Sequence, residues 1–120
     1  MRYLLLLLTI LLVSCASPKP APNAFNDAEE AIEAAIAAGA EEHSPVELRF
    51  AREKLAEAYK GMEFKQADKS VYLIEQSEIN SELAIEKSKT AIMRARVTEL
   101  ARQNELLLED FEATYGEDVQ

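Results

Sequence analysis

The chain has 120 residues, which leaves room for one small domain and no more. Glycine (3 residues) and proline (4 residues) are scarce and tryptophan is absent. Ala, Glu, Lys, Leu and Arg dominate after residue 26, so we expect an all-α fold without a sheet. Acidic residues outnumber basic ones by 22 to 13, and a net charge of -9 with no basic block argues against nucleic acid as a partner.

Residues 1–14 have the order of a signal peptide. Arg2 provides a positive start, the apolar run from Tyr3 to Val13 is interrupted only by Thr9, and small residues follow. A helix that spans a bilayer needs roughly 20 residues, and this run has only about eleven. We therefore expect a short signal peptide and not a permanent transmembrane helix.

Cys15 is the single cysteine of the chain and stands directly after this segment. The stretch Leu12-Val13-Ser14-Cys15 resembles the signal of bacterial lipoproteins, with Leu three positions before the cysteine and a small residue next to it. The resemblance implies cleavage before Cys15 and the attachment of long acyl chains, such as palmitate, to this residue. Because each buried CH₂ contributes about 0.8 kcal/mol, two or three such chains hold a protein stably at a membrane.

Two other roles for Cys15 stay open from the residues alone: a buried thiol, and an intermolecular disulfide in an oxidising compartment. Ala16 and Ser17 follow the cysteine, with no Asp among them. In the lipoproteins that the signal resembles, this implies the outer membrane and not retention at the inner one. We expect a protein that is lipid-anchored in the cell outer membrane, on its periplasmic side.

The next segment is predicted to be a tether. Residues 16–25, "ASPKPAPNAF", hold three of the four prolines and show no apolar periodicity. With Cys15 they form segment 15–25, which extends by about 3.1 Å per residue where it is polyproline-like. We place the helical domain at residues 26–115 and a disordered tail at residues 116–120.

The helical pattern begins at Asn26, which is predicted to cap a first helix with Glu29 three residues later. Gly39 is predicted to end that helix in a left-handed conformation. One apolar face is predicted, made by Ala28, Ala31, Ile32, Ala35 and Ile36.

A second helix is predicted to begin at Ser44, with Pro45 in the first helical position and Glu47 three residues after the serine. Gly61 is predicted to break it, with a turn at residues 60–64. Its packing seam is predicted to be Leu48, Ala51, Leu55, Ala58 and Met62. The aromatic residues predicted to lock the tip of the hairpin are Phe50, Tyr59, Phe64 and Tyr72.

From this turn to about Thr114 the chain contains no Pro or Gly, which predicts a third helix of ~50 residues, about 75 Å long. A turn centred near residue 62 predicts three pairs of facing residues: Ala58 with Ala67, Leu55 with Val71, and Ala51 with Ile74. The first two helices are too short to cover all of this third helix. The predicted fold is a helical hairpin or a small three-helix arrangement with one long, coiled-coil-like C-terminal helix.

The uncovered end of the third helix has a heptad pattern: Val97, Leu100, Asn104, Leu107 and Phe111, with Asn104 at an a-like position. A lone Asn at such a position fixes the register of paired coiled coils. This pattern favours self-association or docking on another envelope protein. The alternative is an exposed helix end that frays.

Two motifs in the first half of the predicted helical domain resemble a bacterial envelope family, domain-of-unknown-function family 4398. They are the joint "AxxAGAEExxPxEL", which begins at Ala35, and the segment "FAREKLAEA", which begins at Phe50. A third helix after a short Gly-containing turn completes the resemblance, over about residues 28–100. The resemblance implies a helical hairpin, carried on a lipoprotein or placed ahead of a peptidoglycan-binding domain. It implies no catalytic residues.

The sequence does not predict a catalytic site or a metal site in which several side chains converge. His43 lies beside Glu41 and Glu42, but consecutive residues in a joint do not converge on a metal ion as residues four apart on a helix do. Ser44 has no nearby base. We expect no enzyme, no metal and no cofactor. The expected function is a lipid-anchored helical scaffold or interaction module of the cell envelope, and the alternative is a soluble or loosely attached periplasmic binding or chaperone-like protein.

Overall fold

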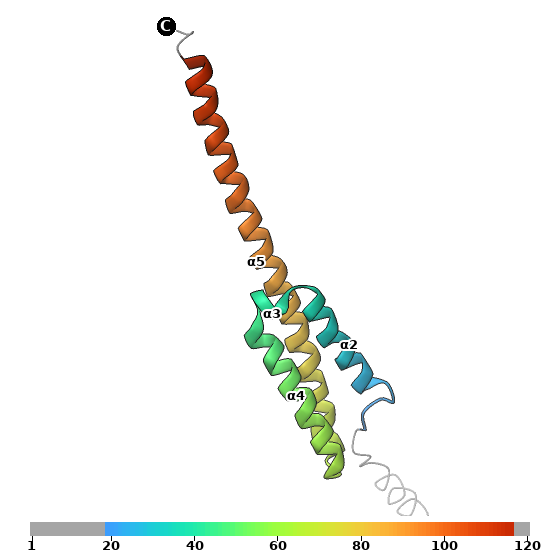
Figure 1. Ribbon diagram of the computed structural model, residues 1–120. Coiled ribbons are helices and arrows are strands. Elements are labelled where there is room, and N and C mark those ends of the chain that lie inside the picture. Colours follow the sequence, from blue (N-terminus) through green and yellow to red (C-terminus); the bar gives the residue numbers. More distant parts are fainter. Residues whose placement is uncertain (1–18, 117–120) are drawn as a thin grey trace, which may run out of the picture.

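The computed structural model describes residues 19–116, and every structural statement below concerns this part of the chain. It consists of helices without strands: α2 (Ala24–Ala37), α3 (Ala40–His43), α4 (Pro45–Glu63) and α5 (Ala67–Tyr115) (Figure 1). The predicted all-α class is confirmed. The predicted signal peptide 1–14, Cys15 and residues 117–120 of the predicted tail lie outside the described residues.

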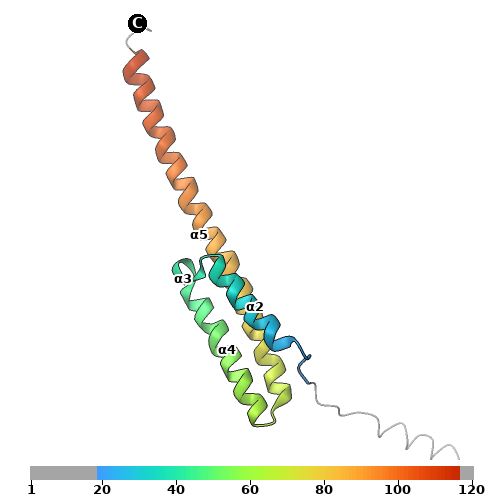
Figure 2. The same cartoon turned by 45° about the vertical axis from the view of Figure 1, so that its right-hand side comes forward.

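The long helix α5 organises the fold. α4 returns alongside its first half as an antiparallel hairpin, and α2 packs against the same half, so that three helices form a small bundle (Figure 1). The short helix α3 joins α2 to α4 at one end of this bundle. Beyond that level α5 continues alone, which both views show (Figure 2). The predicted three-helix arrangement with one long C-terminal helix is confirmed.

The start of α2 differs from the prediction. The capping position is Asn23 and not Asn26, and the Asn23 side chain donates a hydrogen bond to Asp27 at 2.7 Å. The predicted boundary of the tether at residue 25 is therefore wrong by two residues. The reason is tertiary: the ring of Phe25 stacks on Tyr59 of α4 at 4.3 Å between centroids, which holds the first turn of α2 on the bundle.

The joint between α2 and α4 follows the local signals. Gly39 has φ +84°, so its predicted left-handed conformation is confirmed. α4 begins at Pro45 as predicted, with a buried Ser44 before it. The Ser44 hydroxyl does not accept a backbone N–H; it donates to the Glu47 carboxylate at 2.8 Å.

Gly61 does not break α4, which is a correction to the prediction. The helix runs through it to Glu63, and the turn comes later, at residues 64–66, with Lys65 at φ +58°. Gly61 is buried, and a Cβ at this position would overlap the side chain of Ser70. Its role is therefore close contact between α4 and α5.

The later turn shifts the register of the hairpin. The Ser70 hydroxyl donates to the carbonyl oxygen of Ala58, and the Ser77 hydroxyl donates to that of Ala51, each at 2.9 Å. The α5 partners of Ala58 and Ala51 thus lie three residues further along than predicted. The predicted pairs Ala58 with Ala67, Leu55 with Val71 and Ala51 with Ile74 are wrong in register for this reason.

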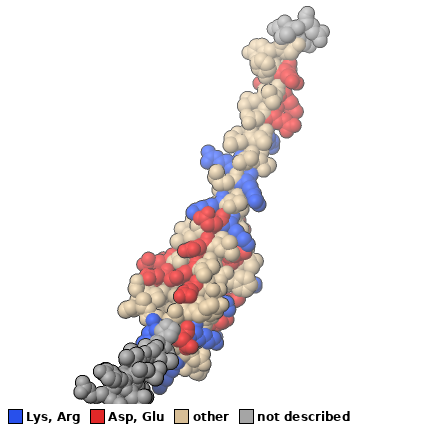
Figure 3. All heavy atoms as spheres, turned by 180° about the vertical axis from the view of Figure 1, so that it is seen from behind, with Lys and Arg blue, Asp and Glu red and all other residues tan. Residues whose placement is uncertain are grey.

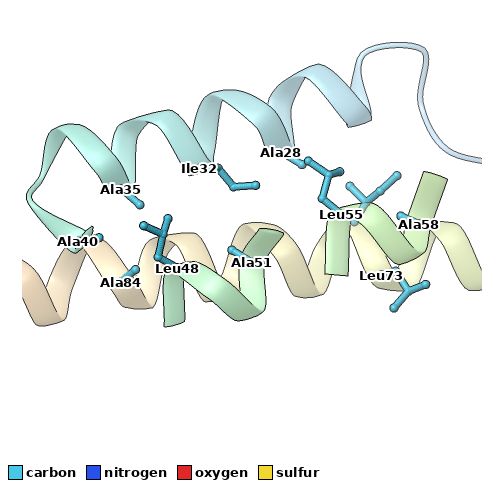
Figure 4. Close-up of a cluster of buried hydrophobic side chains, with 11 residues drawn as sticks. Ala28, Ile32, Ala35, Ala40, Leu48, Ala51, Leu55, Ala58, Leu73 and Ala84 are labelled. Carbon is cyan, nitrogen blue, oxygen red and sulfur yellow. The ribbon is translucent and has the colours of Figure 1, made fainter. Parts of the chain in front are cut away.

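The core is rich in alanine, and its buried side chains lie between α2, α4 and α5 (Figure 4). Met62, predicted in the α4 seam, is 42% exposed, and Gly61 takes its place. On α5 the seam also contains the buried serines Ser70, Ser77, Ser81 and Ser88, which the sequence reasoning missed. The buried apolar residues are Ala28, Ile32, Ala35, Ala40, Leu48, Ala51, Leu55, Ala58, Leu73, Ile74 and Ala84.

The predicted aromatic cluster at the hairpin tip is wrong. Phe50, Phe64 and Tyr72 are all exposed, between 41% and 73%. Tyr59 turns instead toward α2, where it stacks on Phe25 and donates a hydrogen bond to Glu29 at 2.7 Å. The hairpin prediction did not include a contact between Tyr59 and α2, and α2 provides the partners that Tyr59 uses.

Candidate interaction surface

The C-terminal half of α5 is not covered by another helix in the described part of the chain, although Ile92 at its start lies close to Gly39 of the joint. Ser88 is the last buried residue of α5, and every residue from Ile92 to Gly116 is exposed. We call Ile92–Tyr115 the arm; at 1.5 Å per residue it extends about 36 Å beyond the bundle. The arm is bare because α2 ends and α4 begins at the same level, so neither helix reaches further along α5 (Figures 1 and 2).

One side of the arm carries a row of apolar residues. Their side chains are between 50% and 65% exposed and are spaced alternately four and three residues apart, with Asn104 in the one polar position. Such spacing places side chains along one side of a helix, as in a coiled-coil seam. We call this set the arm row: Met93, Val97, Leu100, Asn104, Leu107 and Phe111.

The arm row begins one layer before the predicted pattern. Met93 stands four residues before Val97 and was missed, although the same heptad spacing identifies it. Met93 and Val97 also line a shallow open groove where the arm leaves the bundle, together with Thr90 and Thr98 and the stems of Lys89 and Arg94. The row is thus apolar and accessible from its first residue.

The charges near and on the arm are divided into two halves. Residues 89–103 hold Lys89, Arg94, Arg96 and Arg102 against the single Glu99, a net charge of +3. Residues 104–115 hold only acidic charges, Glu105, Glu109, Asp110 and Glu112, a net charge of -4. Figure 3 shows the basic half in blue next to the bundle and the acidic half in red toward the free end.

Local hydrogen bonds stabilise the arm as a lone helix. Arg102 donates two bonds to Glu99, at 2.9 and 3.1 Å, and Gln103 donates a third at 2.8 Å. The bonds from Arg102 and then Gln103 lower the pKa of Glu99, and the same contact with Glu99 raises the pKa of Arg102. Pairs three or four residues apart stabilise an isolated helix in this way.

The described chain enters the bundle far from the arm. Pro20 and Ala21 share the lining of a small pocket with Val71, Ile74 and Glu78 of α5, in the half of the bundle near the α4–α5 turn. The start of the described chain and the free end of the arm therefore lie at opposite ends of the molecule (Figure 1). Cys15 precedes this entry point and lies outside the described residues.

An acidic cluster borders the entry point. Glu78 is half-buried, and burial, followed by the nearby charges of Asp27, Glu75 and Glu82, raises its pKa. At the other end of the bundle the Lys87 ammonium pairs with Glu47. That contact, followed by the Ser44 hydroxyl, lowers the pKa of Glu47.

His43 lies in the joint as predicted, with Nε2 4.0 Å from a Glu42 oxygen. Within residues 19–116 no group of three His, Cys, Asp or Glu side chains converges on a point where a metal ion could bind. None of the helices described here combines the length and the hydropathy needed to cross a bilayer. The arm is the feature of residues 19–116 that is best suited to an interaction.

These features define an all-helical bundle domain with an unaccompanied C-terminal arm. Residues 23–100 match the model of a family described as a domain of unknown function (DUF4398), and the chain belongs to that family. The match covers α2, α3, α4 and the basic half of the arm as far as Leu100, and the acidic half of the arm follows it. No curated protein and no solved structure matches the chain.

Proposed function

We propose that the protein is a lipid-anchored, non-enzymatic interaction module of the cell envelope, held in the outer membrane by acyl chains on Cys15 and facing the periplasm. The observation that carries the proposal is the arm, a helix of about 36 Å with an exposed apolar row along one side. Contiguous exposed apolar surface on a small protein marks an interaction site.

The position of the chain entry supports the anchor. Pro20, which lies against α5 at the end of the molecule opposite the arm, is only five residues after Cys15 in the sequence. Residues 16–23 span at most about 3.5 Å each, roughly 28 Å in all. An anchor at Cys15 therefore keeps the bundle near the bilayer and leaves the arm row free for a partner.

Mass spectrometry of the membrane fraction tests the anchor. We expect an N-terminal peptide that begins at Cys15 and carries the mass of its acyl chains, with the protein in the outer-membrane band of a density gradient. A Cys15→Ala variant should leave the membrane fraction. An unmodified Cys15 on a protein in the soluble fraction would refute the anchor.

Co-purification of the intact lipidated protein from membranes tests the arm. Val97→Ser and Leu107→Ser remove two members of the arm row, and the partners that co-purify with the wild type should no longer co-purify with these variants. Tyr72→Ser is the matched control, because Tyr72 is equally exposed but lies on the bundle. If the arm variants retain the same partners as the control, the arm is not the interaction surface.

The groove at Met93 and Val97 favours one alternative, a soluble or loosely attached periplasmic protein that binds apolar segments of clients. The two functions differ in their need for the anchor. A Cys15→Ala variant would keep full activity as a free chaperone-like binder, whereas an anchored module would lose activity together with its location.

A further inference from the structure

The basic half of the arm comes first along the chain and the acidic half follows, so two arms match in charge only when they run in opposite directions. A second arm lying alongside in the same direction would set the basic half against the basic half and the acidic half against the acidic half. A second arm in the opposite direction sets each half against its complement. We propose that the arms of two copies of this chain pair in antiparallel orientation, which rests on the proposed function only in taking the arm as the interaction surface.

The arm row fits an antiparallel pair centred at Arg102. This centre places Met93 opposite Phe111 of the second copy, and Val97 opposite Leu107 of the second copy. Each contact occurs twice because the two copies are equivalent. Leu100 lies opposite Asn104 of the second copy, and the other four apolar residues of the row gain apolar partners, which gives the pairing its hydrophobic driving force.

The overlap ends where the bundle begins. With the centre at Arg102, Tyr115 of the second copy lies opposite Lys89, one residue after Ser88, the last buried residue of α5. The second arm therefore occupies the bare length of α5 without displacing α2 or α4. The arm of 24 residues and the overlap of 27 residues agree to within one turn of helix.

Residues beside the row distinguish the two directions. Arg96 and Asp110 each stand one residue before a member of the row, at a g position of the heptad. In an antiparallel coiled coil, g positions of one helix face g positions of the other. Arg96 thus faces Asp110 of the second copy, and neither makes an ion pair within residues 19–116. A parallel pair sets Lys89 beside Arg94 instead, which is repulsive.

Asn104 lies two residues from the centre of the antiparallel pair. Each Asn104 therefore faces Leu100 of the second copy, and the levels of the two Asn104 residues are about 6 Å apart along the helix axis. A parallel pair would place Asn104 opposite Asn104 of the second copy. The antiparallel direction therefore rests on the charges and not on this residue.

Analytical ultracentrifugation of the chain from Ala16 to Gln120 tests the pairing. This chain contains every core residue and no cysteine, and so carries no lipid. We expect a monomer–dimer equilibrium whose dissociation constant rises severalfold as salt screens the opposite charges. A monomer at all concentrations would overturn the inference, and a dimer strengthened by salt would overturn the antiparallel direction.

Disulfide trapping tests the direction itself. Chains with Met93→Cys and chains with Phe111→Cys are mixed, the two being distinguished by mass, and oxidised. Antiparallel arms give the mixed disulfide, whereas parallel arms give two homodimers and overturn the proposal. Glu109→Cys, on the opposite side of the helix from the row, is the control that should not crosslink with Met93→Cys.

A charge exchange tests the Arg96–Asp110 contact. Arg96→Asp and Asp110→Arg should each raise the dissociation constant about tenfold, and the double variant should restore it. Additive losses in the double variant would overturn the contact. These assays use lipid-free protein, so a failed pairing leaves the anchor to be judged by mass spectrometry and other partners by co-purification.

Discussion

The side chain of Ser70 lies directly against Gly61, and from there its hydroxyl donates a hydrogen bond to the carbonyl oxygen of Ala58 at 2.9 Å. This contact joins α4 to α5 at the closed end of the hairpin. It requires a residue without Cβ on one helix and a small donor on the other. It also sets the register that places Ser77 against Ala51.

Gly61→Ala should destabilise the bundle by about 1–2 kcal/mol, because overpacking at Ser70 outweighs the helix propensity gained by alanine. Ser70→Ala removes the obstructing oxygen, so the double variant should recover most of the loss. Urea unfolding of the four chains measures the coupling. Strictly additive changes would show that the two residues do not constrain each other.

The buried serines of α5 should differ in their contributions. Ser77→Ala removes a hydrogen bond to α4 and should cost about 0.5–1 kcal/mol of unfolding free energy. Ser81 bonds only to Ser77 in its own helix, so Ser81→Ala should be neutral or stabilising by up to about 0.5 kcal/mol. Equal effects in urea unfolding would contradict the distinction between bonds across and within helices.

The Lys87–Glu47 pair should give acid-dependent stability. The lowered pKa of Glu47 means that its contribution is present above the ordinary value of 4.5 and disappears as pH falls through the lowered value. Lys87→Met should therefore cost at most about 1 kcal/mol at pH 7, because Lys87 is half exposed and solvent screens the pair.

Urea unfolding at pH 7 and at successively lower pH measures this contribution. Lys89→Met is the control, since its ion pair with Glu86 is exposed on both sides. A loss that stays constant down to the lowest pH at which the bundle is folded would count against the pair.

Glu78 should behave in the opposite way. Its raised pKa means that the folded state binds a proton more tightly than the unfolded state, so the ionised carboxylate destabilises the bundle near pH 7. Glu78→Gln should stabilise the protein by a few tenths of a kcal/mol at pH 7, and the gain should shrink as pH falls through the raised pKa. Thermal unfolding across this range, with Glu63→Gln as an exposed control, measures the effect.

Replacing the arm row should leave the bundle intact. Val97 and Leu107 are 62% and 65% exposed, so Val97→Asp combined with Leu107→Asp should change the free energy of unfolding of the bundle by less than about 0.5 kcal/mol. Leu73→Asp, in the core, is the contrasting variant and should unfold the bundle. A bundle destabilised equally by the arm variants would indicate contacts between the arm and the bundle.

Features that depend on neighbours along the chain were predictable. The joint from Gly39 to Pro45 was located correctly because a left-handed glycine and a proline in the first helical position act through local backbone geometry. The length of α5 followed from a run without Pro or Gly, and most of the arm row followed from its spacing. The family resemblance rested on the same joint, and the family match confirms it.

Features that depend on contact between helices were not predictable from the sequence. The local preference of Gly61 predicts a helix break, because the sequence does not show that Ser70, nine positions away, packs against Gly61 and leaves no room for a Cβ. With a break at Gly61, the turn is predicted too early and the facing residues of α4 and α5 are predicted three residues out of register. The buried serines of α5 are then not recognised as part of the seam. The sequence likewise predicts Tyr59 at the hairpin tip, because it does not indicate that Phe25 stacks on Tyr59.

The sequence by itself determined a helical chain with an apolar row at its far end, since composition, spacing and caps act over a few residues. Only the tertiary structure decided which surface of α5 is free. Tight packing at Gly61 and Ser70 sets how far α4 runs along α5, and the joint at Gly39 sets where α2 stops. Beyond that level no helix covers α5, and the arm with its two charged halves is left exposed.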